Sequence, residues 1–169
     1  MTINFFDTKY ETTVDISEFG ICDEESVNHS YLALDLSDKS NWIAIVKNPA
    51  NLELIHTPID KCLDLRRENG EADNKCDSML YKQFELILFI ELKKRRSSGW
   101  VSDAVKQLKA TIQHFKNTHP YEYDLFIKKE AHIANFLHPK FNSFSSNVKE
   151  EFLAETGFRL FATAEIPII

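Results

Sequence analysis

The sequence predicts a mixed α/β (α+β) fold in which a central mixed β-sheet is flanked by helices. The segment from Phe84 to Glu91 is largely apolar on both faces, as expected of a strand in the middle of a sheet. Apolar residues at helical spacing follow it between Val101 and Phe115. Strand-like segments lie on both sides of these two elements, and such an alternation of strands and helices is typical of layered α/β architectures.

The bulk composition is that of one globular domain. Of the 169 residues, 43% are hydrophobic and 27% are charged, and only four Gly and five Pro argue against linkers or repeats. The longest apolar run, Leu86 to Ile90, is too short to cross a bilayer, and the N-terminal residues lack the features of a secretory signal. We therefore expect one domain over residues 1–169, in the cytoplasm and away from membranes.

The cysteines and the net charge limit the classes of function that are compatible with this sequence. The three cysteines have no CxxC spacing, which favours free thiols in a reduced compartment over a zinc site. A net charge of −6 is opposite to that of proteins that coat nucleic acid through bulk electrostatics. Basic residues are nevertheless concentrated at Lys93, Lys94, Arg95 and Arg96. This run is either a solvated strand end or a group of phosphate contacts.

The first half of the chain contains most of the strand signals. Residues 32–36 are compatible with either a strand or a helix. Strands are predicted over 42–46 and 52–56, and the turn residues at 48–51 predict a hairpin between them. Residues 64–75 are polar and rich in turn formers, so they predict a surface loop.

The clearest helix is predicted in the second half of the chain. The apolar repeat over 101–115 defines it, and Ser98 or Ser102 is available as its N-terminal cap. The pattern after this helix is ambiguous between two structures. Residues 123–127 resemble a strand, whereas residues 125–136 are also compatible with a helix.

A second helix is predicted near the C-terminus. It covers residues 148–156, with Ser146 or Asn147 as its cap, and Gly157 is placed to end it. Residues 158–166 then read as a final strand.

Two carboxylates and a lysine fall on the two central strands. Asp77 lies in a strand-like segment, residues 76–81, which we expect to pair with the apolar strand through a tight hairpin. Glu91 and Lys93 are two residues apart, which places them on the same face of a strand. Buried charges require a partner or a metal. Because two carboxylates can hold a hard divalent cation and a lysine can orient a water, the pattern indicates metal-dependent phosphodiester cleavage.

This hypothesis makes a claim about strand register. A two-residue turn at 82–83 would place Asp77 and Glu91 on opposite faces of the sheet. A three-residue loop at 82–84, or one bulge, would place Asp77 opposite Phe89, with Glu91 diagonally across from it on the same face. The hypothesis therefore requires an odd-length loop or a bulge.

Together these features resemble the PD-(D/E)XK nuclease superfamily, which has the restriction-endonuclease-like fold. The resemblance is strongest over residues 50–130. In that superfamily an aspartate, a glutamate and the backbone carbonyl after the glutamate bind Mg²⁺. The resemblance implies that Asp77, Glu91 and the carbonyl of Leu92 hold Mg²⁺ or Mn²⁺, and that Lys93 is the catalytic lysine.

The resemblance extends to the following helix and has some departures. Several branches place a glutamine there, which implies a catalytic role for Gln107, with Gln113 as a second candidate. Cys76 stands where a proline often precedes the aspartate, and Thr111 stands where some branches have tyrosine. Many members also supply an upstream acidic ligand, for which four residues are compatible: Glu18, Glu24, Glu25 and Glu53.

Three functions are compatible with these residues. The first is a bacterial-type nuclease that hydrolyses nucleic acid, with DNA expected rather than RNA. The second is a catalytically silent nuclease-fold module, of immunity type or an accessory subunit, whose acidity suits a basic protein partner. Either of these two functions is compatible with a homodimer or with a partner protein in a defence or repair complex. The third is an unrelated α/β binding protein, in which Asp77 and Glu91 would not converge.

Overall fold

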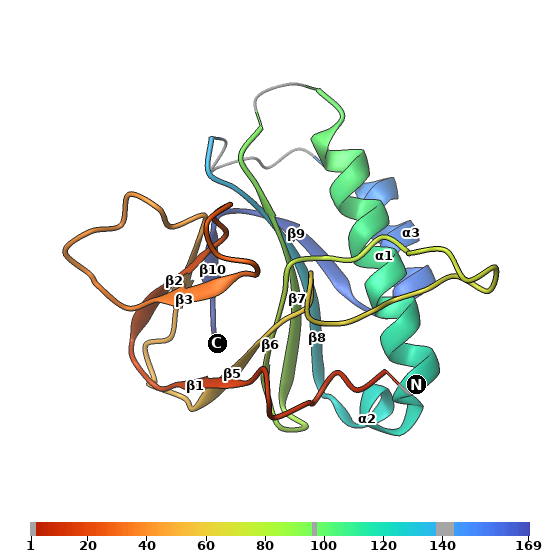
Figure 1. The fold of residues 1–169 in the computed structure, drawn as a ribbon, viewed down its shortest axis with the longest axis horizontal. Helices are drawn as coiled ribbons and strands as arrows, with labels where there is room; N and C mark the ends of the chain where they lie inside the picture. The colour runs from red at the N-terminus through yellow and green to blue at the C-terminus, as the bar shows by residue number, and fades with distance from the viewer. Residues whose placement is uncertain (1–2, 96–97, 138–143) are drawn as a thin grey trace.

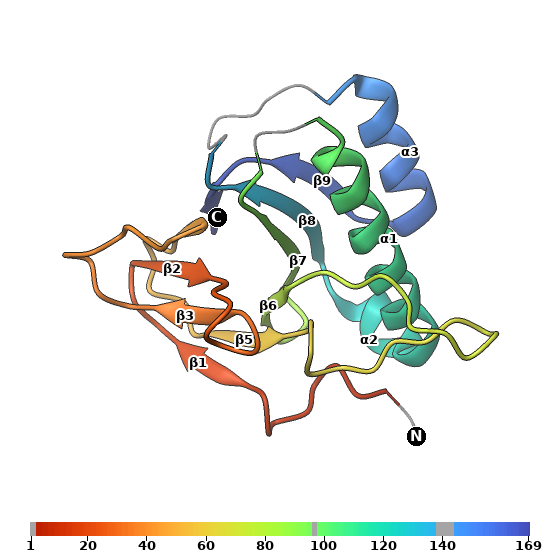
Figure 2. The ribbon, with the colours of Figure 1, turned by 45° about the horizontal axis from the view of Figure 1, so that its top comes forward.

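The chain folds into three layers: helices, a six-stranded sheet and a four-stranded sheet (Figures 1 and 2). The computed structural model describes residues 3–95, 98–137 and 144–169, and the elements named here lie within them. The helices are α1 (Trp100–Thr118), α2 (Pro120–Leu125) and α3 (Ser146–Thr156). The strands are β1 (Thr12–Val14), β2 (Glu18–Cys22), β3 (Tyr31–Ala33), β4 (Ala44–Lys47), β5 (Leu54–Pro58), β6 (Ser78–Lys82), β7 (Leu86–Lys93), β8 (Lys128–Asn135), β9 (Arg159–Ala162) and β10 (Glu165–Pro167). This architecture confirms the predicted mixed α/β class.

The larger sheet has the order β1-β5-β6-β7-β8-β9. Its strand β7 pairs antiparallel with β6 and parallel with β8, so it lies in the middle of the sheet. Every residue of β7 is buried, which confirms the prediction drawn from its two apolar faces. The parallel connection from β7 to β8 passes through α1 and α2, and the connection from β8 to β9 passes through α3.

The two faces of β7 belong to two hydrophobic cores. Ile87 and Phe89 point toward the helices, where they pack in a cluster that includes Leu108 of α1. Leu88 and Ile90 point the other way, into a cluster with residues of the four-stranded sheet β10-β4-β2-β3. The alternation along one strand therefore fixes which side chains reach α1. Among the helices described, none is long and apolar enough to cross a membrane.

The predicted hairpin between residues 42–46 and 52–56 is wrong, because its two strands belong to different sheets. The turn at 48–51 is present, with the N–H of Asn51 donating to the carbonyl of Asn48 at 2.9 Å. The buried Asn48 side chain donates to the carbonyl of Leu52 and accepts from its N–H. This turn moves the chain from β4 in one sheet to β5 in the other, instead of folding it back on itself.

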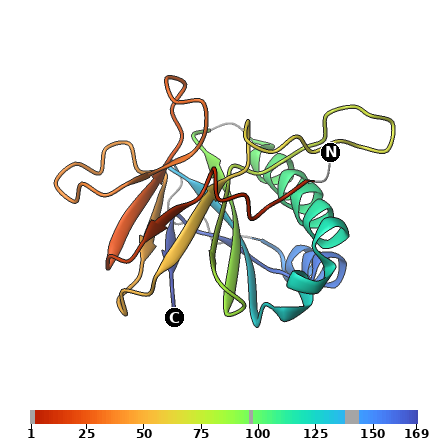
Figure 3. The same cartoon turned by 60° about the horizontal axis from the view of Figure 1, so that its bottom comes forward.

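The loop predicted over residues 64–75 is confirmed apart from one isolated β-bridge. It extends away from the sheets beside α1 (Figures 1 and 3). His114 of α1 contacts the carboxylate of Asp73 at 3.0 Å, which ties the loop to the helix. The ambiguous segment at 32–36 contributes only its first two residues to a strand, β3.

The region around α1 corrects three expectations. The helix begins after Gly99, whose φ is 93°, and no side chain caps it, so Ser98 and Ser102 do not have that role. The strand over 123–127 is wrong, because this segment contains the end of α2. The helix over 125–136 is also wrong, because pairing with β7 holds the segment as β8.

The C-terminal helix is capped one residue earlier than expected. The Ser145 hydroxyl accepts a hydrogen bond from a first-turn N–H, so neither Ser146 nor Asn147 is the cap. Gly157, with φ of 76°, ends the helix as predicted. The single strand predicted over 158–166 is instead divided between the two sheets, with β9 beside β8 and β10 beside β4.

Candidate active site

The hairpin between β6 and β7 has the odd-length loop that the site hypothesis requires. Pairing ends at Lys82 opposite Leu86, which leaves a three-residue loop at 83–85, one residue later than expected. In the middle of this loop, Phe84 has φ of 58° and its ring lies 6.1 Å from the ring of Phe126.

This shift places the two carboxylates directly opposite each other. The first pair of the ladder is Ser78 with Ile90, so the preceding residue, Asp77, faces Glu91 across the two strands. The expectation that Asp77 would lie opposite Phe89 is wrong in this detail. The expectation that both carboxylates lie on one face is met, because residues in register point to the same side of a sheet. That side is the one covered by α1.

Lys93 lies between Glu91 and a helix residue. Its Nζ is 2.6 Å from Glu91 Oε1 and donates a hydrogen bond of 2.7 Å to Gln107 Oε1. Gln107 in turn donates to the backbone carbonyl of Lys75 at 3.2 Å. Glu91 is 1% exposed and Lys93 is 9% exposed, so this ion pair is buried. The amide of Gln107 therefore fixes the position of the ammonium group.

Three oxygen atoms at this edge can accept a cation. Asp77 Oδ2 already accepts the N–H of Leu92 at 2.6 Å, which leaves Oδ1 available. Glu91 Oε2 is buried and has no hydrogen-bond partner among the described residues. The N–H and C=O of a strand residue point to the same edge, so the carbonyl of Leu92 also faces Asp77. An unpartnered buried carboxylate oxygen is costly, which suits a position filled by a cation.

The raised pKa values of Asp77 and Glu91 also favour a bound cation at this site. Burial raises the pKa of Asp77 to about 7, and the negative charges of Asp23 and Asp60 add to this against the opposing hydrogen bond from Leu92. Burial and the charge of Asp77 also hold the pKa of Glu91 well above its usual range, in spite of Lys93. One ammonium group thus does not compensate two carboxylates, of which Glu91 is buried and Asp77 is half-buried. A divalent cation would favour ionisation of both.

The donor set fits Mg²⁺ rather than a metal enclosed by protein ligands. Among the residues described, no three His, Cys, Asp or Glu side chains come together as a metal-binding group. Asp77, Glu91 and the Leu92 carbonyl supply oxygen atoms only. Mg²⁺ is often held by one or two carboxylates and completed by water and substrate phosphate, which matches this set.

Two acidic residues near the centre were missed in the sequence. Asp23 follows β2, and Asp60 follows β5, which pairs with β6; the charges of both reach Asp77. Among the upstream glutamates considered, Glu18 is paired with two lysines and Glu24 accepts the hydroxyl of Tyr31. Only the order of the strands would have indicated Asp23 and Asp60, because neither is near Asp77 in the sequence.

The residues that depart from the superfamily pattern connect α1 to the start of β6. The N–H of Cys76 donates to the hydroxyl of Thr111 at 2.8 Å, and both residues are fully buried. The Thr111 hydroxyl donates to the carbonyl of Gln107, one helical turn earlier. Thr111 thus links the backbone beside Asp77 to the helix that carries Gln107.

The basic run lies at the exposed end of β7. Lys94 Nζ donates to the carbonyl of Asp23 at 3.0 Å, and the guanidinium of Arg95 is 3.8 Å from the carboxylate of Asp103. Both side chains are exposed. Arg96, the third predicted phosphate contact, lies outside the described residues.

Comparisons of this chain with protein-family models, curated proteins and solved structures give no match. The functional interpretation therefore rests on the geometry of this site.

Proposed function

We propose that this protein is a metal-dependent nuclease with a restriction-endonuclease-like core, and that it hydrolyses phosphodiester bonds in DNA rather than RNA. The observation that carries the proposal is the convergence of Asp77, Glu91 and Lys93 where two interior strands of the sheet meet, with Glu91 and Lys93 buried and Asp77 half-buried. A chance motif in an unrelated protein gives no reason for such convergence. Fold analogy alone would not suffice, since function depends on the site.

The metal-binding role belongs to Asp77, Glu91 and the carbonyl of Leu92. A bound Mg²⁺ or Mn²⁺ supplies Lewis-acid polarisation of the phosphate and a water of lowered pKa. The protein holds Asp77 through the N–H of Leu92, so the carboxylate is oriented before any ligand arrives. Preorganised charge of this kind is an effective source of transition-state stabilisation.

Lys93 acts on the reacting phosphate and the attacking water. An ammonium group has three hydrogen-bond donors, and Glu91 and Gln107 engage two of them. The remaining donor orients the water or stabilises the charge that develops on the phosphate oxygens. Gln107 acts as a positioning residue, since it holds Lys93 rather than the substrate. Lys94, Arg95 and Arg96 are proposed to contact flanking phosphates.

The direct test is calorimetric titration of Mg²⁺ and Mn²⁺ into the wild-type protein and three variants. Asp77→Asn should remove binding, because the centre loses one of its two carboxylates. Lys93→Met should retain metal affinity but lower the rate of DNA cleavage by about 10²- to 10⁴-fold. Glu85→Gln, an exposed change on the same hairpin, is the matched control and should bind metal and cleave as wild type does.

Two results would contradict the proposal. Unchanged metal affinity in Asp77→Asn would mean that the cation lies elsewhere, and unchanged cleavage in Lys93→Met would remove the catalytic role of the lysine. A wild-type protein that neither binds metal nor cleaves a panel of DNA and RNA substrates would favour the silent interaction module. Its acidic net charge suits a basic protein partner.

A further inference from the structure

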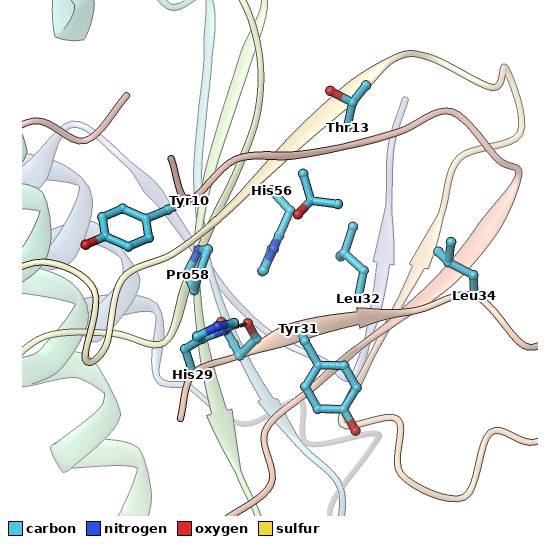
Figure 4. A pocket seen from close by; sticks show the side chains of 10 residues that line it. Tyr10, Thr13, His29, Tyr31, Leu32, Leu34, His56 and Pro58 are labelled. Carbon is cyan, nitrogen blue, oxygen red and sulfur yellow. Dashed lines mark hydrogen bonds between the residues drawn. The ribbon is translucent and has the colours of Figure 1, made fainter. Parts of the chain in front are cut away.

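A cavity of about 250 Å³ lies between β1, β3 and β5 (Figure 4). His56 of β5 lines it and is in register with Leu80, whose side chain belongs to the core away from α1. The cavity is therefore on the opposite face of the sheet from Asp77 and Glu91. Its volume is slightly below the range of about 300–1,000 Å³ that drug-sized ligands occupy, which fits a single planar ring system.

A chain of hydrogen bonds fixes which nitrogen of His56 carries a proton. The hydroxyl of Ser30 donates to the carbonyl of Asp77 at 2.9 Å, and a carbonyl can only accept. The hydroxyl of Ser78 donates to Ser30 at 2.6 Å, so its proton is also committed. Ser78 must therefore accept its 3.1 Å contact from the Nε2–H of His56. Burial lowers the pKa of His56 to about 3, which keeps the ring neutral and leaves Nδ1 as an acceptor.

His29 supplies a second acceptor to the same cavity. Its Nδ1 is 2.8 Å from the carbonyl of Ser30 and so carries the proton, which leaves Nε2 as the acceptor nitrogen. Within the described chain, His56 Nδ1 has no hydrogen-bond partner, although His56 is 2% exposed. Figure 4 shows both rings at the cavity, with the ring of Tyr31 nearby. The hydroxyl of Tyr31 donates to Glu24, which holds the ring in place.

The lining residues indicate the class of ligand. They include no Lys or Arg, so the cavity has no charge to bind a phosphate group. Aromatic rings and the neutral imidazole of His56 favour a flat, uncharged heterocycle with N–H donors.

The cavity also adjoins the proposed metal centre. Ser30, in its wall, donates to the backbone carbonyl of Asp77, and the same carbonyl accepts the N–H of Ile59, the residue after Pro58 in the wall. The cavity and the proposed metal centre therefore lie on opposite faces of the sheet but share one backbone group, the carbonyl of Asp77.

We propose that this cavity binds an unpaired nucleobase with an exocyclic amino group, from the nucleotide next to the cleaved phosphate. The placement beside the cleaved phosphate rests on the proposed nuclease function. The amino group donates to His56 Nδ1 and His29 Nε2, and the base packs against the aromatic side chains. The substrate is accordingly single-stranded at this nucleotide, or has its base turned out of the duplex.

The test is a titration of the full chain, labelled with ¹⁵N in its histidines, and followed by NMR. Adenosine and cytidine should shift the imidazole signals of His56 and His29, and thymidine, which has no exocyclic amino group, should bind at least about tenfold more weakly. His56→Phe and the half-buried His29→Phe should each abolish this preference. His114→Gln, on a different surface, is the control and should leave it intact.

The outcomes distinguish failure of the base site from failure of the proposed nuclease function. Equal shifts with thymidine or with inorganic phosphate, no shifts at all, or stoichiometric Zn²⁺ binding by the two imidazoles would overturn the base site. Metal-dependent cleavage that is unaffected by an abasic nucleotide beside the cleaved bond would overturn it while leaving the nuclease function standing. Selective nucleoside binding without cleavage of any substrate would support the base site and overturn the nuclease function.

Discussion

Glu91 and Asp77 face each other across two strands with one ammonium group between Glu91 and α1. Their pKa values are raised chiefly by burial, and the charge of Asp77 also raises the pKa of Glu91. In the absence of a cation, the pair therefore holds a proton near neutral pH. This is a measurable property of the site that does not depend on finding the substrate.

We predict that Mg²⁺ or Mn²⁺ binding near pH 7 releases protons, because the metal requires both carboxylates to be ionised. Calorimetric titrations in buffers that differ in ionisation enthalpy would measure the number released. Glu85→Gln should release as many protons as wild type. Equal binding enthalpies in all buffers would mean that both carboxylates are already ionised, contrary to the raised pKa values.

The site residues differ in how far the sequence could predict them. Glu91 and Lys93 share a face by strand periodicity, whereas the approach of Asp77, just before β6, also depends on the length of the hairpin loop, which the sequence left open. Ser30, in the loop before β3, reaches the backbone carbonyl of Asp77, and His56 of β5 reaches the hydroxyl of the next residue, Ser78. Their approach depends on pairing between distant segments, which no local pattern encodes.

At the level of elements, the ring of Trp42 packs closely against the backbone of β2 at Gly20. Gly20 lies in β2, and a Cβ atom added there would come within 2.3 Å of the Trp42 ring. The ring is almost fully buried and cannot move aside without disturbing the core.

We therefore predict that Gly20→Ala lowers the free energy of unfolding by about 1–3 kcal/mol, the usual cost of overpacking. Urea denaturation followed by circular dichroism would measure it. Adding Trp42→Leu to Gly20→Ala should cost less than the sum of the two single changes, because the smaller side chain leaves room for the methyl group. Strict additivity would show that the ring does not limit the position.

The elements that were predicted well are those specified by their own residues. β7 and α1 have patterns that identify them without knowledge of their neighbours, and the structure contains both. The predictions fail where the structure of a segment depends on the segment with which it pairs. The turn at Asn48 is compatible with a hairpin or with a crossing between sheets, and the buried contacts of its side chain select the crossing.

For the whole molecule, the raised pKa values make stability depend on pH. A carboxyl group whose pKa is higher in the folded than in the unfolded state stabilises the fold at low pH, and this contribution is lost as pH rises through the folded pKa. For Asp77 the loss extends from the unfolded value, about 4, up to about 7.

We predict that ionisation of Asp77 costs the metal-free protein about 1–3 kcal/mol of unfolding free energy between about pH 5 and about pH 8, measured as the difference between wild type and Asp77→Asn. The comparison is needed because the lowered pKa of the buried His56 acts in the opposite direction and adds stability as pH rises toward its unfolded value of about 6.5. Urea denaturation at several pH values with a chelator present would measure this difference. Added Mg²⁺ should restore stability at the higher pH, since binding favours the folded state. A difference between wild type and Asp77→Asn that stays constant over this range would contradict the raised pKa of Asp77.

The crossing at Asn48 and the division of the last strands have a consequence for synthesis of the chain. β10, at residues 165–167, pairs with β4, and β9 completes the other sheet beside β8. Neither sheet is complete before the residues of β9 and β10 have left the ribosome, so the apolar strands synthesised earlier remain without these partners until then. Such delayed long-range pairing makes folding slow and exposes the nascent chain to aggregation. The protein should therefore gain more than most small domains from chaperones that hold emerging chains.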